Sequence, residues 1–312
     1  MFKNIKGIHH ITSIVGDPQE NVDFYAGVLA LRLIKQTVNF DDPGTYHLYF
    51  GNHIASPGSA ITFFPWPGAQ QGTIGDGQVG VTSYAVPKGA LGFWQNRLAK
   101  FKIEHQITKR FGEEYLQFKD VHGLNLEIVE REEGMENQWS FGGVTPEVAI
   151  KGFAGATLFS SAPNKTAELL EKHLGLQVVG TEGELIRLKA SGETANIIDL
   201  KTVPGIRGRQ GVGTVHHIAW SVADDNEELQ WKSLLESQGY GVTPLIDRNY
   251  FHSIYFREAG NILFEIATET PGFDVDEPLE ALGESLKLPS QYEPYRSKIE
   301  QSLLPVKVRE LQ

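Results

Sequence analysis

The chain has 312 residues, of which 40% are hydrophobic and 21% charged, and a formal net charge of −11, as expected for a globular protein with a sizeable core. The negative charge argues against nucleic acid as a partner, and the lack of a long apolar run or signal-peptide segment argues against a membrane, so we expect a cytoplasmic protein. Because cysteine is absent, disulfides and thiolate metal sites are excluded, and any metal must be held by His, Asp or Glu.

In chain order, the predicted elements fall into four similar groups. Each group opens with a strand rich in β-branched or aromatic residues, continues with an amphipathic helix and ends in further strands. The opening strands are predicted at residues 8–15, 79–86, 153–160 and 215–222. The helices are predicted at 18–29, 90–101, 165–174 and 226–238. The later strands are predicted at 31–38, 46–50, 60–64, 115–118, 124–129, 186–189, 196–200, 253–257 and 262–267.

Two of the opening strands share a pattern in which a double histidine precedes a valine and an aspartate. The two segments are Gly7–Asp17 and Thr214–Asp224, offset by 207 residues (217 − 10). This offset divides into three steps of 69, which indicates internal repetition. We therefore predict an α+β fold of four βαβββ modules followed by a tail. The modules are predicted at residues 1–68, 78–135, 147–203 and 213–270, and the tail at 271–312.

The second histidine of each pair is the better candidate for a metal ligand. Side chains alternate across a strand, so only one histidine of each pair can face a shared site. His10 and His217 each lie seven residues before the aspartate that ends their segment, so they occupy equivalent positions. We expect His9 and His216 to pack behind them.

A carboxylate in the last module supplies a third candidate ligand. Glu265 lies between Phe264 and Ile266 in an apolar strand, where an isolated charge would be too costly to bury. Two histidines and one carboxylate form the facial triad that favours non-haem Fe(II) with open coordination positions. The sequence therefore predicts His10, His217 and Glu265 as ligands of Fe(2+).

The triad also predicts how the modules pair. Metal–ligand bonds are about 2 Å long, so modules one and four must form one half-open β-barrel, and modules two and three the other. In module two, Glu127 aligns with Glu265 at an offset of 138 residues (265 − 127), but no histidine lies in register with it. We interpret Glu127 as an inherited or salt-bridged acid. The counterpart of Glu265 in module one falls in Ile61–Phe64, which has no strong ligand.

Six short stretches of the chain, taken together, indicate a resemblance to a known family. They are Gly7–Ile11, Asp17–Tyr25, Thr37–Pro43, Tyr46–Tyr49, Val215–Trp220 and Leu263–Thr268. Together they resemble the vicinal oxygen chelate superfamily of glyoxalases, bleomycin-resistance proteins and extradiol dioxygenases. Within it, the chain is most similar to bacterial ring-cleaving dioxygenases that act on hydroquinones. The resemblance implies an Fe(II)-dependent enzyme whose partners are a small aromatic substrate and O2.

The resemblance also implies roles for residues near the ligands. Tyr255 lies ten residues before Glu265, at the offset of a tyrosine that assists catalysis in extradiol dioxygenases. His47 and His252 are candidates for proton transfer, with a structural role as the alternative for each. Arg248 either contacts a ring hydroxyl or forms the turn before its strand. Apolar residues such as Phe64 and Trp66 are candidates for lining the ring pocket.

Other functions stay open at this point. A glyoxalase-type isomerase or thiol transferase using Ni(II), Zn(II) or Mn(II) would want a fourth strong ligand. A non-catalytic protein that binds aromatic toxins would need no triad. The wider extradiol signature is kept only in part, because Ala259 follows Glu258 where the family has proline. The sequence decides neither whether the chain forms a homo-oligomer nor whether its tail, with a helix predicted at 292–302, covers a pocket.

Overall fold

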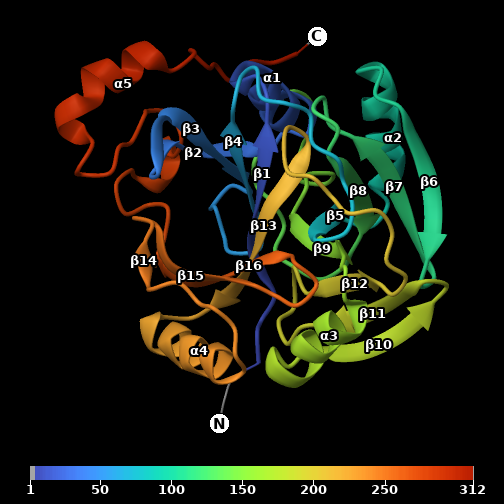
Figure 1. Ribbon diagram of the computed structural model, residues 1–312. Helices are drawn as coiled ribbons and strands as arrows, with labels where there is room; N and C mark the ends of the chain where they lie inside the picture. The colour runs from blue at the N-terminus through green and yellow to red at the C-terminus, as the bar shows by residue number, and fades with distance from the viewer. Residues whose placement is uncertain (1–3, 312) are drawn as a thin grey trace.

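The computed structural model describes residues 4–311 and shows two curled sheets of eight strands each, with helices packed on their outer faces (Figure 1). The first sheet has the strand order β14-β15-β16-β13-β1-β4-β3-β2. The second has the order β10-β11-β12-β9-β5-β8-β7-β6. Each sheet forms a half-open barrel, and the two half-barrels lie side by side.

The first half-barrel is built from the first and last modules. The first module contains β1 (Ile8–Val15), α1 (Pro18–Val22), the π-helical turn η1 (Asp23–Val28), β2 (Arg32–Asn39), β3 (Asp42–Gly51) and β4 (Ala60–Pro65). The fourth contains β13 (Thr214–Val222), α4 (Asp225–Ser237), β14 (Ile246–Asp247), β15 (Phe251–Arg257) and β16 (Leu263–Pro271). The tail follows with η3 (Leu279–Ala281), η4 (Glu293–Tyr295) and α5 (Arg296–Ser302).

The second half-barrel is built from the two middle modules. The second module contains β5 (Gln78–Val86), α2 (Leu91–Lys100), β6 (His105–Arg110), β7 (Glu113–Lys119) and β8 (Asn125–Glu130). The third contains β9 (Gly152–Phe159), α3 (Pro163–Glu168), η2 (Leu169–His173), β10 (Gln177–Glu182), β11 (Leu185–Lys189) and β12 (Ile197–Lys201).

The pairing of the modules follows from their opening strands. β1 runs antiparallel to β13, with Ile11 opposite Ile218, and β5 runs antiparallel to β9, with Thr82 opposite Ala156. In every module the opening strand is also parallel to the closing strand of the same module. The predicted fold class, α+β with modules paired one with four and two with three, is therefore confirmed.

The aspartates of the repeated histidine segments begin helices. The side chain of Asp17 accepts hydrogen bonds from the backbone N–H groups of Gln19 and Glu20, and Asp224 accepts one from Glu227. An aspartate at this position satisfies N–H groups that have no partner inside the helix. The fixed spacing between histidine and aspartate thus reflects a strand that passes directly into a capped helix.

Sequence patterns did not place three short strands, β6, β10 and β14. β10 has only one half-buried residue, Gly180, and no residue of β6 is buried. These strands lie at the edges of their sheets, where one neighbour is missing and no apolar face needs to be buried. Their sequences therefore lack the alternation on which strand prediction depends.

One large apolar cluster runs through both half-barrels and includes the inner faces of the helices. Trp94 and Leu98 of α2 and Trp231 and Leu235 of α4 are almost completely buried in it. Burying each such side chain stabilises the fold by about 1.5–3 kcal/mol. Among residues 4–311, none of the helices combines the length and the apolar character needed to cross a membrane.

Glu228 makes the stability of the protein depend on pH. Its side chain is buried on α4, and burial, with the charges of Asp225 and Glu265, raises the pKa of its carboxyl from 4.5 to about 8. Well below pH 4.5 the carboxyl is protonated in both the folded and the unfolded chain, so its ionisation has no effect on stability. As the pH rises from 4.5 to 8, only the unfolded chain gives up the proton readily, and the folded state loses stability.

We predict that Glu228→Gln raises the melting temperature by roughly 5 °C at pH 8.5 and by a small fraction of that gain at pH 5. Thermal unfolding measured across this pH range tests the prediction. Glu236→Gln on the same helix is the matched control, since Glu236 is exposed and its pair with Lys232 contributes little. An equal gain at both pH values would show that the charge of Glu228 is not the cause.

Candidate metal centre

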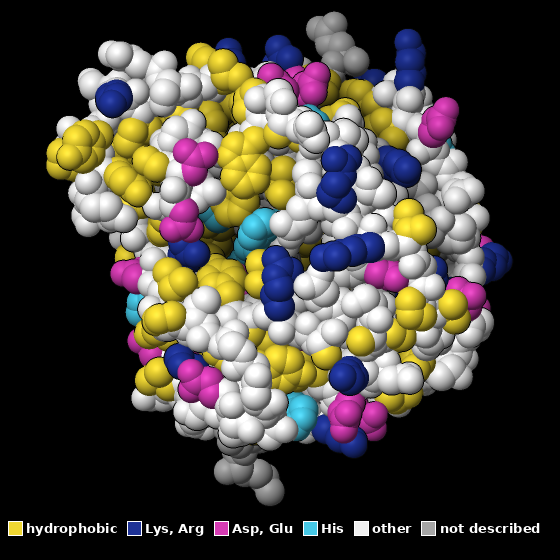
Figure 2. Space-filling model, viewed as in Figure 1, with side chains coloured by type: hydrophobic (Ala, Val, Ile, Leu, Met, Phe, Trp, Pro, Cys, Tyr) yellow, Lys and Arg dark blue, Asp and Glu magenta, His cyan; other side chains and the backbone are white. Residues whose placement is uncertain are grey.

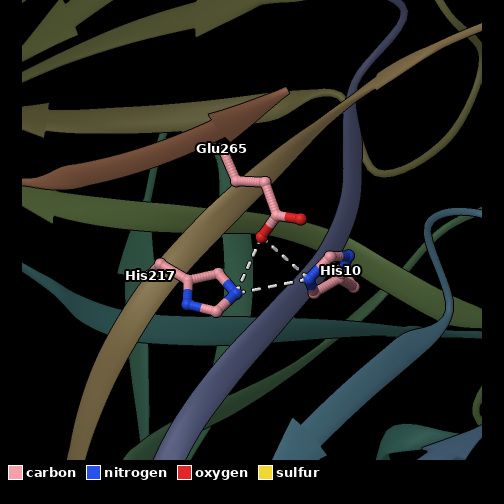
Figure 3. Close-up of side chains that lie close together, drawn as sticks. All are labelled: His10, His217 and Glu265. Atoms are coloured by element: carbon pink, nitrogen blue, oxygen red, sulfur yellow. Dashed lines mark hydrogen bonds and ion pairs between the residues drawn. The ribbon is translucent and has the colours of Figure 1, made fainter. Parts of the chain in front are cut away.

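Three strands bring His10, His217 and Glu265 together at one point inside the first half-barrel (Figure 3). The Nε2 atoms of the two histidines are 3.3 Å apart. Glu265 Oε2 lies 3.2 Å from His10 Nε2 and 2.8 Å from His217 Nε2. All three side chains are buried, with at most 5% of each residue exposed. The structure thus places the three sequence-predicted ligands in contact.

Strand register explains why these side chains meet. In module four, Ala219 of β13 pairs with Glu265 of β16, and His217 lies two residues earlier on the same face. In module one, Thr12 of β1 pairs with Thr62 of β4, and His10 lies two residues earlier. The two modules therefore direct four equivalent positions, two on opening strands and two on closing strands, toward one point.

The three ligand atoms have the spacing that a metal ion requires. Donors about 2.1 Å from one ion and at right angles to one another lie about 3.0 Å apart, close to the observed edges of 2.8, 3.2 and 3.3 Å. Burial by itself would raise the pKa of Glu265, but the attraction of His10 and His217 outweighs it and holds the pKa well below its ordinary value. The residues fit a divalent cation.

His9 and His216 hold the two histidines of the triad from behind. The Nδ1 atoms of His9 and His10 are 2.9 Å apart, and those of His216 and His217 are 2.8 Å apart. Burial and the neighbouring histidine lower the pKa of both His9 and His216 to about 3, so both rings are neutral.

His9 also hydrogen-bonds the backbone of Thr268, which uses its single N–H. Its Nδ1 then accepts a hydrogen bond from Nδ1–H of His10, and the lone pair of His10 Nε2 points at the metal position. This is the usual way in which a ligating histidine is oriented.

A cavity of about 140 Å³ lies against the two histidines of the triad. Figure 2 shows the corresponding hollow near the middle of the face, with histidine side chains beside it. Aromatic rings form much of its wall, and polar groups converge on the rest. The lining residues include Asn39, Phe40, Asp41, His47, Tyr49, Phe64, Trp66, Arg248, Phe251 and Tyr255.

Tyr255 and Arg248 form the wall beside His217. Tyr255 pairs with Glu265 across β15 and β16, and its ring centroid is 5.6 Å from that of His217. Arg248 Nε donates to the Tyr255 hydroxyl at 3.3 Å, and Arg248 Nη1 lies 3.7 Å from Asp41. Burial, with the charge of Glu265, raises the pKa of Tyr255, so its phenol stays protonated and can donate a hydrogen bond into the cavity.

The opposite wall carries a row of hydrogen-bonded groups. His47 Nδ1 is 2.9 Å from the Tyr49 hydroxyl, and His47 Nε2 is 2.9 Å from Thr62 Oγ1. Thr62 Oγ1 is in turn 2.7 Å from Thr12 Oγ1. Burial, with the nearby His10 and His217, lowers the pKa of His47 well below its ordinary value. Thr62 takes the position equivalent to Glu265, so this corner of the centre has a hydroxyl instead of a carboxylate.

Comparison with known proteins shows the family to which the chain belongs. The model of the Glyoxalase/Bleomycin resistance protein/Dioxygenase superfamily matches residues 7–128 and 152–266. The chain belongs to this superfamily. Over 311 residues, the full length of both chains, it is 65% identical to the Bacillus subtilis protein named "Putative ring-cleaving dioxygenase MhqO". The superfamily inferred from the sequence is thereby confirmed.

Two further likenesses cover almost the whole chain. The chain is 35% identical over 304 residues, 93% of its length and 94% of the other's, to the chlorohydroquinone/hydroquinone 1,2-dioxygenase of Sphingobium indicum. A crystal structure titled as a putative dioxygenase from Bacillus subtilis has a TM-score of 0.98 at 65% identity, covering 99% of this chain and 100% of that one. Members of the superfamily thus include a dioxygenase that acts on hydroquinones.

The two histidines expected to transfer protons lie in different places. His47 lines the cavity. His252 lies outside it, with Nδ1 2.6 Å from Asp225 and Nε2 3.9 Å from Asp247. Tyr49 was not identified from the sequence, although it pairs with Thr62 as Tyr255 pairs with Glu265. Comparison of β3 in module one with β15 in module four, the strands that precede the closing strands, could have found it.

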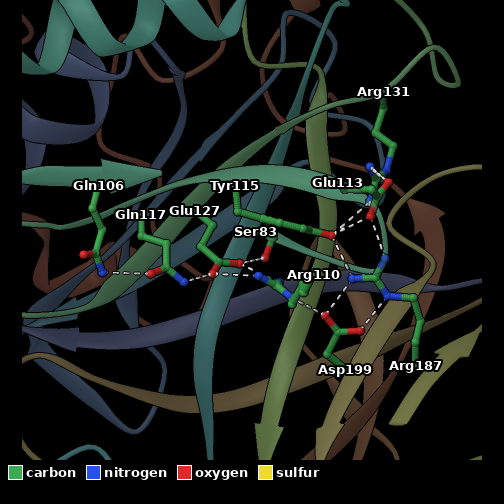
Figure 4. Close-up of polar contacts among 10 residues, drawn as sticks. All are labelled: Ser83, Gln106, Arg110, Glu113, Tyr115, Gln117, Glu127, Arg131, Arg187 and Asp199. Carbon is green, nitrogen blue, oxygen red and sulfur yellow. Dashed lines mark hydrogen bonds and ion pairs between the residues drawn. The ribbon is translucent and has the colours of Figure 1, made fainter. Parts of the chain in front are cut away.

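The second half-barrel has charged side chains where the first has its triad (Figure 4). Val81 and Gly155 take the positions of the two histidines, because Ser83 pairs with Glu127 and Thr157 with Asp199. The guanidinium of Arg110 spans the two acids. It lies 3.0 and 2.7 Å from the oxygens of Glu127 and 2.7 Å from Asp199. The interpretation of Glu127 as salt-bridged is confirmed, and an internal cation occupies this point.

Glu265 and Glu127 form a matched pair for testing the metal centre. We predict that Glu265→Gln weakens the binding of Co(II), measured anaerobically as a probe of the site, by at least about 100-fold. Glu127→Gln should leave the affinity within twofold and lower the melting temperature, because Arg110 loses one of its two buried partners. Equal Co(II) affinity in the two variants would remove Glu265 from the ligand set.

Proposed function

We propose that the chain is an Fe(II)-dependent dioxygenase that opens a single aromatic ring of hydroquinone or catechol type with O2. The observation that carries the proposal is a buried set of three ligands beside a small cavity with aromatic walls. The activity named for the Sphingobium relative supports hydroquinones over catechols. Iron is proposed because two histidines and one carboxylate leave coordination positions free for both substrate and O2.

Fe(II) held by His10, His217 and Glu265 would supply the electron exchange with O2 that an aromatic ring lacks on its own. The protein contributes binding and hydrogen bonds. Arg248 anchors an oxygen atom of the substrate ring through its guanidinium. The protonated phenol of Tyr255 donates a hydrogen bond to the oxygen on which negative charge develops.

The row formed by Tyr49, His47, Thr62 and Thr12 offers a route for a proton. Each member is within 2.9 Å of the next, so a proton received at one end can be passed along by successive exchange. His47 lies at the cavity in the middle of this row, where it can accept a proton at one ring nitrogen as it releases one from the other, so a proton that a substrate hydroxyl passes to Tyr49 can move on to Thr62. This position supports His47 over His252 for the role.

The size of the cavity favours a substrate with one ring. An apolar cavity of about 150 Å³ holds one benzene molecule, and the cavity beside the triad has a volume of about 140 Å³. The rings of Phe64 and Trp66, with centroids 5.6 Å apart, form an apolar wall against which the substrate ring can pack. A second fused ring would have to extend beyond this space toward the surface.

The other functions suggested by the sequence have less support. An isomerase that holds its metal with four strong ligands would need a carboxylate at Thr62, whose hydroxyl is instead engaged by Thr12 and His47. A protein that only sequesters aromatic compounds would not need three buried ligand atoms within 4.8 Å of one another.

Anaerobic loading with Fe(II) followed by addition of O2 tests the proposal. We expect one iron per chain and O2 uptake in equal amount to substrate with single-ring hydroquinones, with both atoms of ¹⁸O2 found in the opened product. Naphthohydroquinones should react much more slowly because of the cavity size. Iron binding without O2 uptake for any hydroquinone or catechol would contradict the proposed reaction, and isomerisation of a thiohemiacetal would support the alternative.

Tyr255→Phe separates chemistry from metal binding. The substitution keeps the ring that packs beside His217 and removes only the hydroxyl that donates into the cavity. We expect unchanged iron content and a turnover number lower by about 100-fold, the scale of a positioned acid–base group. The control is Tyr240→Phe, since Tyr240 is half-buried and its ring contacts Phe256 edge-on outside the cavity. Equal turnover in both variants would reduce Tyr255 to a packing residue.

A further inference from the structure

The C-terminal tail crosses the open side of the half-barrel that contains the triad (Figure 1). It lies along the edge strand β2, where Leu286 pairs with Gln36 as an isolated bridge and Gln36 Nε2 donates to the Gly283 carbonyl at 2.7 Å. Arg32 of the same strand donates to the carbonyls of Leu279 and Glu280 at 2.7 and 3.0 Å. The tail therefore covers an edge that would otherwise be open.

A buried lysine fixes the start of the tail. Lys35 is completely buried, and its Nζ lies 2.6 Å from Asp276 and 2.5 Å from Glu277. The same ammonium lies 4.8 Å from the ring centroid of Tyr250, whose hydroxyl donates to Asp276 at 3.0 Å. A buried charge is costly without its partners, so residues 276 and 277 are held firmly in place.

This anchor places Phe273 inside the half-barrel. Its ring centroid lies 5.3 Å from that of Tyr49, 5.4 Å from that of Tyr250 and 6.5 Å from that of Phe251. These are the distances at which aromatic pairs attract one another. The rings of Phe273, Tyr49, Tyr250 and Phe251 belong to an apolar cluster that is separate from the main core. The other members of this cluster are four alanines, Ile34 and Leu282.

Two of these contacts lead directly to the candidate metal centre. Tyr49 holds His47 through the bond between its hydroxyl and His47 Nδ1. Phe251 packs against the ring of His10, with centroids 5.0 Å apart. We propose that Phe273 of the tail is a positioning residue of the metal centre, which fixes His10 through Phe251 and His47 through Tyr49. The inference rests on the proposed metal site and adds the tail to it.

Anaerobic titration of the full-length chain with Co(II), followed by visible absorption, tests this role without turnover. We expect Phe273→Ala to weaken Co(II) binding about tenfold, the lower end of the effect of partners that orient ligands, and to alter the Co(II) spectrum. Phe273→Leu should restore most of the affinity because it refills the space. If the alanine variant does not fold, Phe273→Val can be tested in the same way, because it removes less side-chain volume.

Leu303→Ala is the matched control. Leu303 is also buried and belongs to the tail, but it packs in the main core and not in the ring cluster around Phe273. It should lower the melting temperature while leaving Co(II) affinity and spectrum unchanged. Wild-type affinity and spectrum in folded Phe273→Ala or Phe273→Val would overturn the positioning role alone. Failure of the wild-type chain to bind Co(II) would overturn the proposed metal site, and this inference with it.

Discussion

A carboxylate buried inside a half-barrel needs a cation beside it, and much of this structure follows from that constraint. Glu265 and Glu127 lie in the same register of equivalent strands, and both are at most 1% exposed. In one half-barrel the partners of the acid are two histidine nitrogens that can share a metal ion with it. In the other, the guanidinium of Arg110 meets the same requirement from within the chain.

The two half-barrels therefore have different interiors on the same backbone plan. Arg110 and Arg187 link Glu127, Asp199 and Glu113 into a network that fills the second half-barrel with charge pairs. The cluster beside the triad in the first half-barrel contains four alanines, and the tail adds the ring of Phe273 and the side chain of Leu282 to it. One interior pairs its acids with its own guanidinium groups, while the other has three candidate ligand atoms beside a cavity.

The chemistry proposed for the first half-barrel depends on a few of these equivalent positions. A hydroxyl at Thr62, where the fourth module has Glu265, leaves three strong ligands and a free corner. The Tyr49 and Tyr255 hydroxyls lie on the strands next to these two positions, so internal symmetry places a phenol on each side of the centre. The Tyr255 hydroxyl accepts a hydrogen bond from the guanidinium of Arg248, whereas the Tyr49 hydroxyl is bonded to His47 Nδ1. The pocket is symmetric in backbone and asymmetric in hydrogen-bonding groups.

The sequence by itself determined the four modules, their pairing and the three candidate ligands. The periodic strands and the offset between His10 and His217 can be read directly from the sequence. Because a metal–ligand bond is short, they also predict which modules lie in contact. The tertiary structure alone decided the contacts between side chains that are far apart in the sequence and belong to no repeated pattern. Arg110 reaches Asp199 across 89 residues, and Lys35 reaches Glu277 across 242, and no pattern along the chain marks either pair. The tertiary structure also separates His47 and His252, equal candidates in the sequence for proton transfer, because it places His47 at the cavity and His252 outside it beside Asp225.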